Sequence, residues 1–122
     1  MNTVYCFILS SLLAAGCAAV GGQPRITEVD RKTYVKQYRA DEQHEDFYVV
    51  WTGANISLVK FEYRQVNAPG ELFAKSYVPT TRRRHVFVIS ADEFQRGGKV
   101  SAWRATLWQD NKIVAEQKSA LW

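Results

Sequence analysis

Apolar and polar side chains alternate along most of the chain beyond residue 40. In residues 46–52, Phe47, Val49 and Trp51 recur at every second position. Successive side chains of a β-strand point to opposite faces, so this pattern indicates strands that bury one face. Strands are predicted at residues 46–52, 56–66, 72–78, 84–90, 100–108 and 113–121.

Residues typical of turns and helix ends separate these segments. Residues 67–70 (Asn-Ala-Pro-Gly) and 110–111 (Asp-Asn) predict turns. Ser90 and Glu93 have the spacing of a capping box, in which each side chain bonds the other residue's backbone N–H. Residues 97–98 (Gly-Gly) predict the end of that single helical turn.

Residues 26–39 fit two structures. Val29, Arg31, Thr33 and Val35 alternate as in a strand, whereas residues 27–30 could instead begin a helix. The strand is the preferred interpretation, and it brings the number of strands to seven.

Seven strands and one helical turn in about 100 residues resemble the immunoglobulin-like and fibronectin type III-like β-sandwiches. The resemblance implies an all-β protein with a single antiparallel Ig-like β-sandwich over residues 26–122. Trp51 and Trp103 would then fill the positions between the sheets where antibody domains place cysteines.

The first segment has a different composition from the rest. No charged residue precedes Arg25, and residues 5–20 are apolar or small. This run is shorter than the ~20 residues of a membrane-spanning helix and is typical of a signal peptide. The sequence predicts a signal peptide at residues 1–16, a link at 17–25 and the domain at 26–122.

Residues 13–17 (Leu-Ala-Ala-Gly-Cys) resemble the signal of bacterial lipoproteins. The resemblance implies cleavage before Cys17, lipid attachment to that cysteine, and an outer-membrane anchor facing the periplasm. An ordinary secretory signal cut near the same place would make the protein secreted, and a retained anchor is the third alternative. Cys6 and Cys17 are the two cysteines, so the domain has no disulfide and depends on its core.

The motifs of common enzymes are missing from the sequence. It has no Gly-x-Ser-x-Gly nucleophile and no glycine-rich phosphate loop, and neither histidine has the spacing of a metal site. His44 lies in the acidic residues 41–46, interpreted as a solvated loop, and His85 is expected to be half-buried. We therefore expect no enzyme activity, no metal and no cofactor.

Two features are candidate contacts. Arg82, Arg83 and Arg84 could bind phosphates of an anionic lipid or another envelope polyanion, or form a solvated loop. An exported protein rarely meets nucleic acid, so nucleic acid is not an expected partner.

The second candidate contact is aromatic. By alternation, Trp108 and Trp122 lie on the face opposite Trp103 and Leu121, and Trp108 shares its side with Arg104. Trp108, Trp122 and Arg104 are predicted to bind a partner, an envelope protein or glycan. Alternatively, the two tryptophans pack against each other across the hairpin or face the second layer.

These expectations indicate a small exported protein, tethered to a membrane through Cys17, that acts as a non-catalytic binding or assembly module of the cell envelope. A glycan- or anionic-lipid-binding or enzyme-inhibitory module is the alternative, and a small envelope hydrolase is the third.

Overall fold

The computed structural model describes residues 22–34 and 43–122. The predicted signal peptide, Cys17 and most of the link lie outside the described residues. Within the described residues, no helix has both the length and the apolar character needed to cross a membrane. In chain order the elements are β1 (Arg25–Tyr34), β2 (His44–Thr52), β3 (Leu58–Gln65), β4 (Ala68–Tyr77), β5 (Arg84–Ile89), α1 (Ala91–Gly97), β6 (Val100–Gln109) and β7 (Lys112–Lys118).

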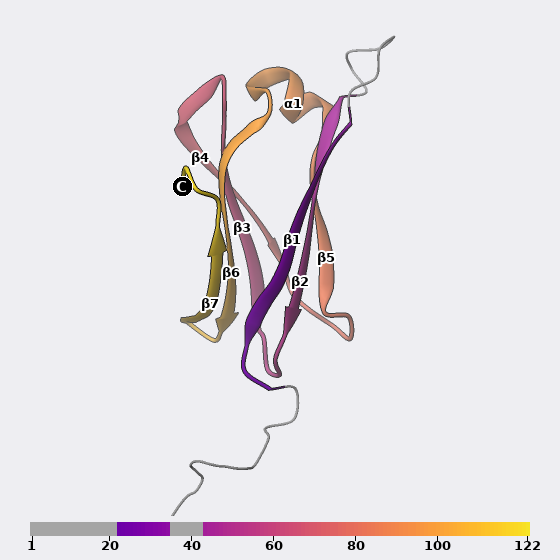
Figure 1. Cartoon of the computed structure of the whole chain (residues 1–122), viewed down its shortest axis with the longest axis vertical. Coiled ribbons are helices and arrows are strands. Elements are labelled where there is room, and N and C mark those ends of the chain that lie inside the picture. Colours follow the sequence, from indigo (N-terminus) through magenta and orange to yellow (C-terminus); the bar gives the residue numbers. More distant parts are fainter. Residues whose placement is uncertain (1–21, 35–42) are drawn as a thin grey trace, which may run out of the picture.

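Seven antiparallel strands form two sheets that face each other, with α1 at one end of the sandwich (Figure 1). One sheet has the order β1-β2-β5 and the other the order β4-β3-β6-β7. The prediction of a single antiparallel Ig-like sandwich of about seven strands is confirmed. In constant-type immunoglobulin domains the fourth strand joins the sheet of the first two, whereas here β4 pairs with β3.

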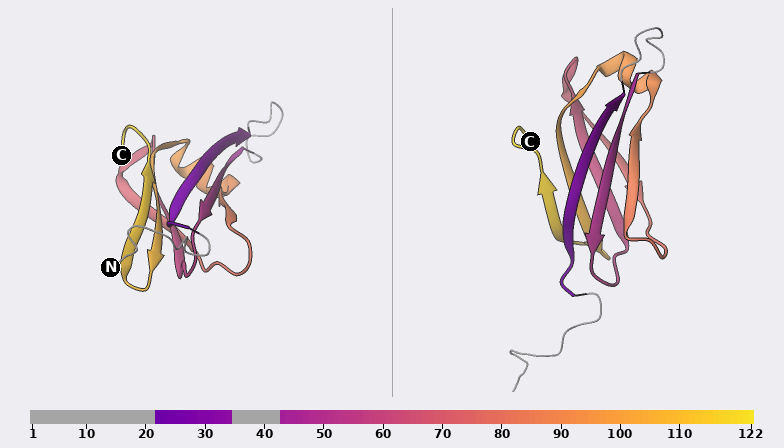
Figure 2. Two further views of the ribbon diagram at one scale, coloured as in Figure 1. Left: turned by 60° about the horizontal axis from the view of Figure 1, so that its bottom comes forward. Right: turned by 45° about the vertical axis from the view of Figure 1, so that its right-hand side comes forward.

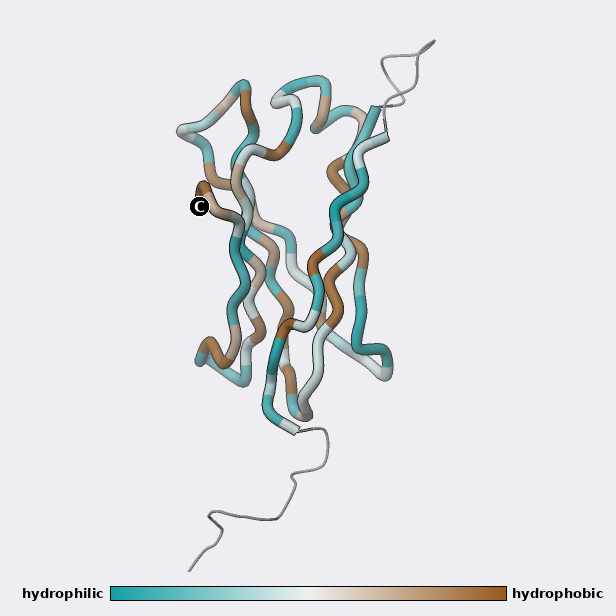
Figure 3. The backbone as a smooth tube through the Cα atoms, viewed as in Figure 1, coloured by the Kyte–Doolittle hydropathy of each residue, from teal (hydrophilic) through white to brown (hydrophobic). Residues whose placement is uncertain are grey.

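The core lies between the sheets and follows from the alternation in the sequence. Burial alternates without a break along β2 and β3, and Figure 3 shows hydrophobic and hydrophilic residues alternating along the same strands. The rings of Phe47 and Phe61, one from each sheet, have centroids 4.7 Å apart. The hydrophobic core comprises Phe47, Val49, Trp51, Val59, Phe61, Tyr63, Phe87, Ile89, Val100, Ala105 and Leu107.

The two central tryptophans occupy separate parts of this core. Trp51 packs against Tyr77 with ring centroids 6.3 Å apart, whereas Trp103 contacts Phe47 and Phe61. Both face the space between the sheets, as the resemblance implied, but each has its own set of neighbours.

The preferred strand interpretation of residues 26–39 is right for its described part, since β1 spans Arg25–Tyr34. The ordered contacts begin before residue 26, because Thr52 donates a hydrogen bond to the carbonyl of Gln23. Gly53 has φ +113°, and a Cβ there would lie 2.7 Å from the Pro24 Cα. Glycine at this position therefore lets the incoming chain lie directly on the end of β2.

The acidic stretch before β2 is not simply a solvated loop, which corrects the sequence interpretation. β2 begins at His44, and Glu45 faces inward and is fully buried. Its carboxylate accepts hydrogen bonds from Arg31 Nε at 2.8 Å, Thr33 Oγ1 at 2.7 Å and the Val100 amide at 2.7 Å. These donors satisfy the charge, so Glu45 fastens β1 and β6 to β2 instead of facing water.

The turn between β3 and β4 was predicted at residues 67–70, which is too far along the chain. The turn consists of residues 66–67 alone, and Ala68, Pro69 and Gly70 already belong to β4. Proline is tolerated there because β4 is an edge strand, whose outer backbone positions need no partner.

Strict alternation also fails in β7. A β-bulge opposite Leu107 and Trp108 pairs Trp108 with Ile113, so Ile113 lies on the outer face and Val114 packs against the core. Leu121, predicted to share the face of Trp103, follows the end of β7 and is 81% exposed.

The predicted helical turn is confirmed as α1, with Ser90 and Glu93 forming a capping box. Glu93 also accepts hydrogen bonds from the Tyr63 hydroxyl at 3.0 Å and from Lys75 at 2.9 Å. Burial alone would raise the pKa of Glu93, but the hydrogen bonds from Ser90, Lys75 and Tyr63 lower it to about 2. Glu93 therefore joins the helix to both β3 and β4.

Candidate functional site

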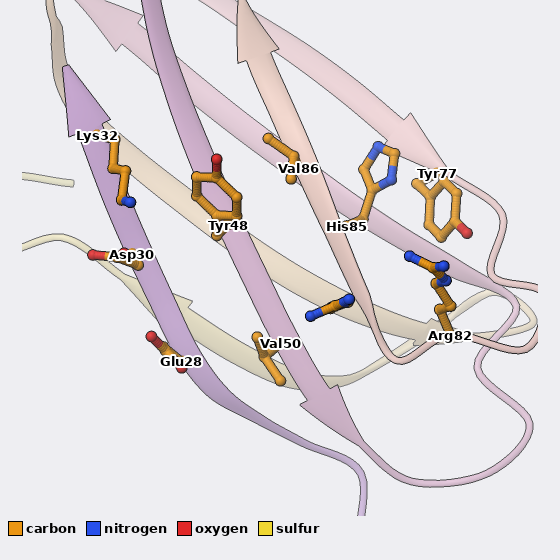
Figure 4. Close-up of a pocket in the computed structure, with 10 residues that line it drawn as sticks. Glu28, Asp30, Lys32, Tyr48, Val50, Tyr77, Arg82, His85 and Val86 are labelled. Atoms are coloured by element: carbon orange, nitrogen blue, oxygen red, sulfur yellow. The ribbon is translucent and has the colours of Figure 1, made fainter. Parts of the chain in front are cut away.

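A hollow of about 660 Å³ lies on the outer face of the three-stranded sheet (Figure 4). Tyr48 and Val50 of β2 and Val86 of β5 form its floor. The rest of its lining is charged or aromatic: Glu28, Asp30 and Lys32 of β1, and Tyr77, Arg82, Arg84 and His85 at the opposite side.

Strand alternation places the acidic side of the hollow. Glu28 and Asp30 are two residues apart on β1, so their side chains share the outer face. The register pairs them with Val50 and Tyr48 respectively. Both carboxylates are exposed, and they stand beside an apolar floor.

The opposite side of the hollow is basic. Arg84 opens β5 and pairs with Val50, and Arg82 lies in the segment that precedes it. The Arg83 carbonyl accepts a hydrogen bond of 3.0 Å from the Trp51 amide, which fixes the backbone between the two arginines. The hollow thus has carboxylates on one side and guanidinium groups on the other, separated by the width of the sheet.

An aromatic stack closes the basic side. The rings of His85 and Tyr77 lie 3.8 Å apart between centroids and are inclined by 12°, and the edge of Phe87 meets His85. Burial lowers the pKa of His85 below its ordinary value of 6.5. The imidazole is therefore neutral at pH 7 and presents a flat uncharged ring beside two arginines.

Tyr48 occupies the middle of the floor. Its hydrogen bond with Tyr34 is the main cause of a raised pKa, so its hydroxyl stays protonated at neutral pH. The Lys32 ammonium lies 5.7 Å from the centre of its ring, within the range of a cation–π contact. Tyr48 offers a flat apolar surface and a polar tip to anything seated in the hollow.

Acidic and histidine residues near the hollow do not assemble a metal centre in the part of the chain that the structure describes. Along β2, His44 and Asp46 face outward and Glu45 faces inward, so the acidic stretch is split between two faces. The geometry suits binding by stacking, apolar contact and ion pairing.

The predicted arginines reach two hollows. Arg82 and Arg84 line the larger one, while Arg82 and Arg83 border a second hollow of about 300 Å³ beside residues 53–56. All three arginines are exposed, and no ion pair of theirs exists within the described residues. Their predicted role in binding a polyanion stays a prediction.

The predicted aromatic contacts lie on the other sheet, and each has partners within the protein. Trp108 is half-buried, its indole N–H donates to Thr106 at 2.9 Å, and Lys60 lies 5.7 Å from its ring centre. Trp122 is half-buried beneath the Arg64 guanidinium, 5.8 Å from its ring centre.

Arg104 forms ion pairs with Glu62 and Glu116 on the two flanking strands. The described rings show no contact between Trp108 and Trp122, since they lie over opposite ends of β3. This face is therefore internally paired, and its predicted partner-binding role stays a prediction.

The hollow itself was missed by sequence reasoning. Its acidic side was hidden in the ambiguous segment 26–39, and its floor combines strands that are far apart in the sequence. The outward positions of β1 and β2 were the available signal, because Glu28, Asp30 and Lys32 repeat at every second residue. Comparisons of the chain with family models, with curated proteins and with solved structures found no match, so the case for function rests on this geometry.

Proposed function

We propose that the protein is a non-catalytic binding module of the bacterial cell envelope, exported and anchored through a lipid on Cys17. The observation that carries the binding role is the hollow on the β1-β2-β5 sheet, with its apolar floor and oppositely charged sides. A partner can bury apolar surface on Tyr48, Val50 and Val86 and form ion pairs at either side.

The anchoring part of the proposal rests on residues 13–17, with their small residues before a cysteine. The intact mass of the mature N-terminal peptide from the native host tests it. A diacyl or triacyl mass on Cys17 supports a lipid anchor, which we propose lies in the outer membrane. An unmodified N-terminus at or after that residue would make the protein a secreted one.

The binding role is tested by photo-crosslinking in the native envelope. A benzophenone side chain replaces Val86 on the floor of the hollow, and the matched control replaces Ser76, an exposed outer-face residue of β4 on the other sheet. We expect a discrete adduct from position 86 and none from position 76. Equal adducts at both positions, or none at either, would contradict a role for the hollow.

A second candidate function, binding of an anionic glycan or lipid, is favoured by Arg82 and Arg83, which line the second hollow and form no ion pair within the described residues. The third, a small envelope hydrolase, predicts turnover of an envelope substrate that Glu28→Gln or Asp30→Asn abolishes. A non-catalytic binding module predicts no turnover of such a substrate by the parent protein or by either variant.

A further inference from the structure

We infer that one end of the sandwich is a docking surface for an anionic lipid bilayer. This end, called the entry end, consists of residues 22–25, 53–57, 78–84 and 109–112. This inference rests on the proposed function for the anchor at Cys17. The surface itself consists of described residues and can be tested without the lipid.

The entry end is where the chain enters the domain. β1 begins at this end, and the β2–β3, β4–β5 and β6–β7 connections surround it, while α1 occupies the far end (Figures 1 and 2). Cys17 and Arg25 are 25 − 17 = 8 residues apart, so their separation is at most about 29 Å. An anchor at Cys17 therefore keeps this end close to the membrane.

Charge separates the two ends. The entry end contains five basic residues and one acidic residue, whereas residues 65–71 and 90–99 at the far end contain two basic and three acidic residues. Strands of ten residues hold the ends about 30 Å apart, several times the ~8 Å screening length at physiological ionic strength. A bilayer at the entry end therefore meets a surface of net charge 5 − 1 = +4.

The basic cluster is held by backbone contacts, and the side chains of Arg82, Arg83 and Arg84 form no ion pair within the part of the chain that the structure describes. The Trp51 amide fixes the Arg83 carbonyl, and Ser57 binds both the Trp108 carbonyl and the Asp110 amide. Gln109 donates to the Ala54 carbonyl at 3.0 Å. These hydrogen bonds tie all three connections to neighbouring strand ends. Figure 3 shows the last part of the segment before β5 as strongly hydrophilic.

The second hollow gives this end a place for a headgroup. It measures about 300 Å³ and lies between the β2–β3 and β4–β5 connections, with Arg82 and Arg83 beside Asn55, Thr80 and Thr81. Guanidinium groups bind phosphate oxygens by paired hydrogen bonds, and the hydroxyl and amide groups add further donors.

Exposed aliphatic residues flank the charges. Val78 is 67% exposed and precedes the arginines, and Ile113 follows Lys112 and is 39% exposed. Cationic groups beside exposed apolar side chains are typical of surfaces that lie at a bilayer interface. The short distance to the anchor at Cys17, together with these aliphatic residues, favours a bilayer over a soluble polyanion as the occupant.

The test uses residues 17–122 with Cys17→Ser, which carries no lipid and keeps the whole core, because all core residues lie between Phe47 and Leu107. Vesicles contain equal parts of phosphatidylglycerol and phosphatidylcholine, or phosphatidylcholine alone. We expect flotation with the anionic vesicles, weakened by salt, and little with the neutral ones.

Two charge-matched variants locate the surface. Arg82→Ala/Arg83→Ala removes two cations from the entry end, and Arg96→Ala/Lys99→Ala removes two exposed cations from the far end. Each juxtamembrane cation contributes roughly a fivefold factor in partitioning, so the first variant should bind about 25-fold more weakly and the second nearly unchanged. Unchanged thermal unfolding of both variants excludes misfolding as the cause.

The proposal is overturned if both variants lose binding equally, if neutral vesicles bind as well as anionic ones, or if the protein binds heparin, a soluble polyanion, but not the vesicles. Failure of the anchor is a separate result, because it appears only in the mass of the native N-terminal peptide.

Discussion

Replacing Gly97 with alanine tests how the far end of the sandwich is packed. Gly97 is the last residue of α1 and is buried against the Gln65 side chain. A Cβ at position 97 would lie 2.7 Å from Gln65 Nε2 and nearer still to the amide carbon and oxygen. The added methyl group must therefore displace the Gln65 side chain.

The cost follows from what Gln65 does. It is 3% exposed, and its amide nitrogen donates to the carbonyls of Glu93 and Gly98, both at 2.9 Å. Losing two buried hydrogen bonds and leaving their groups unpaired costs about 3 kcal/mol. Alanine recovers about 0.5–1 kcal/mol through its higher helix propensity. The net loss of stability is then about 2 kcal/mol, or roughly 10 °C in Tm for a domain of this size.

Urea unfolding of four proteins measures this cost: the parent, Gly97→Ala, Gln65→Ala and the double variant. We expect Gly97→Ala to destabilise by about 2 kcal/mol in the parent and, once Gln65 is truncated, to stabilise by about 0.5–1 kcal/mol through the helix propensity of alanine. Gly70→Ala is the control, because a Cβ there meets no atom within 4 Å. An equal cost of Gly97→Ala in both backgrounds would refute the steric argument.

Three further predictions concern buried charges and titration. Glu45→Ala leaves Arg31 without its carboxylate and should cost about 3–5 kcal/mol in urea unfolding, more than replacing Arg31 and Glu45 together by methionine. The pKa of Glu93 is lowered from 4.5 to about 2, so its stabilisation is complete above pH 4.5 and is lost as the pH falls toward 2. With solvent screening, the parent should lose about 2 kcal/mol more than Glu93→Gln across that window, and parallel curves would contradict it. Because burial lowers the pKa of His85 below 6.5, stability should fall as the pH drops below that value, and His85→Phe should remove this part of the Tm decline.

Local pattern predicted most of the fold because the core is built from strict alternation. The period of two was enough to place three side chains in the core, those of Phe47, Val49 and Trp51. The capping box was equally local, since Ser90 and Glu93 bond each other across three residues.

The errors arose where a distant partner decides the outcome. Glu45 is buried because Arg31, Thr33 and Val100 supply donors, and only the pairing of β1 and β6 with β2 brings those donors together. The bulge opposite Trp108 turned Ile113 outward, and nothing in the sequence of β7 marks it.

The candidate site was predictable only in its basic half. Arg82, Arg83 and Arg84 are consecutive, so their cluster is visible in the sequence. The acidic half required knowing that β1 and β5 flank β2 in one sheet. The partner-binding role predicted for Trp108 took no account of Lys60, which lies over its ring.

The link between Arg31 and Val100 has a consequence for the order in which the domain assembles. The Arg31 guanidinium donates to the Val100 carbonyl at 2.6 Å, although the two residues are 69 positions apart. β1 is thus secured by a strand far along the chain, and closing so long a loop is slow relative to forming the local hairpins. Until β6 joins its sheet, Glu45 has no amide from Val100, and β1 must stay soluble without that contact. The polar and exposed character of β1 suits a strand whose partner lies two-thirds of the domain further along the chain.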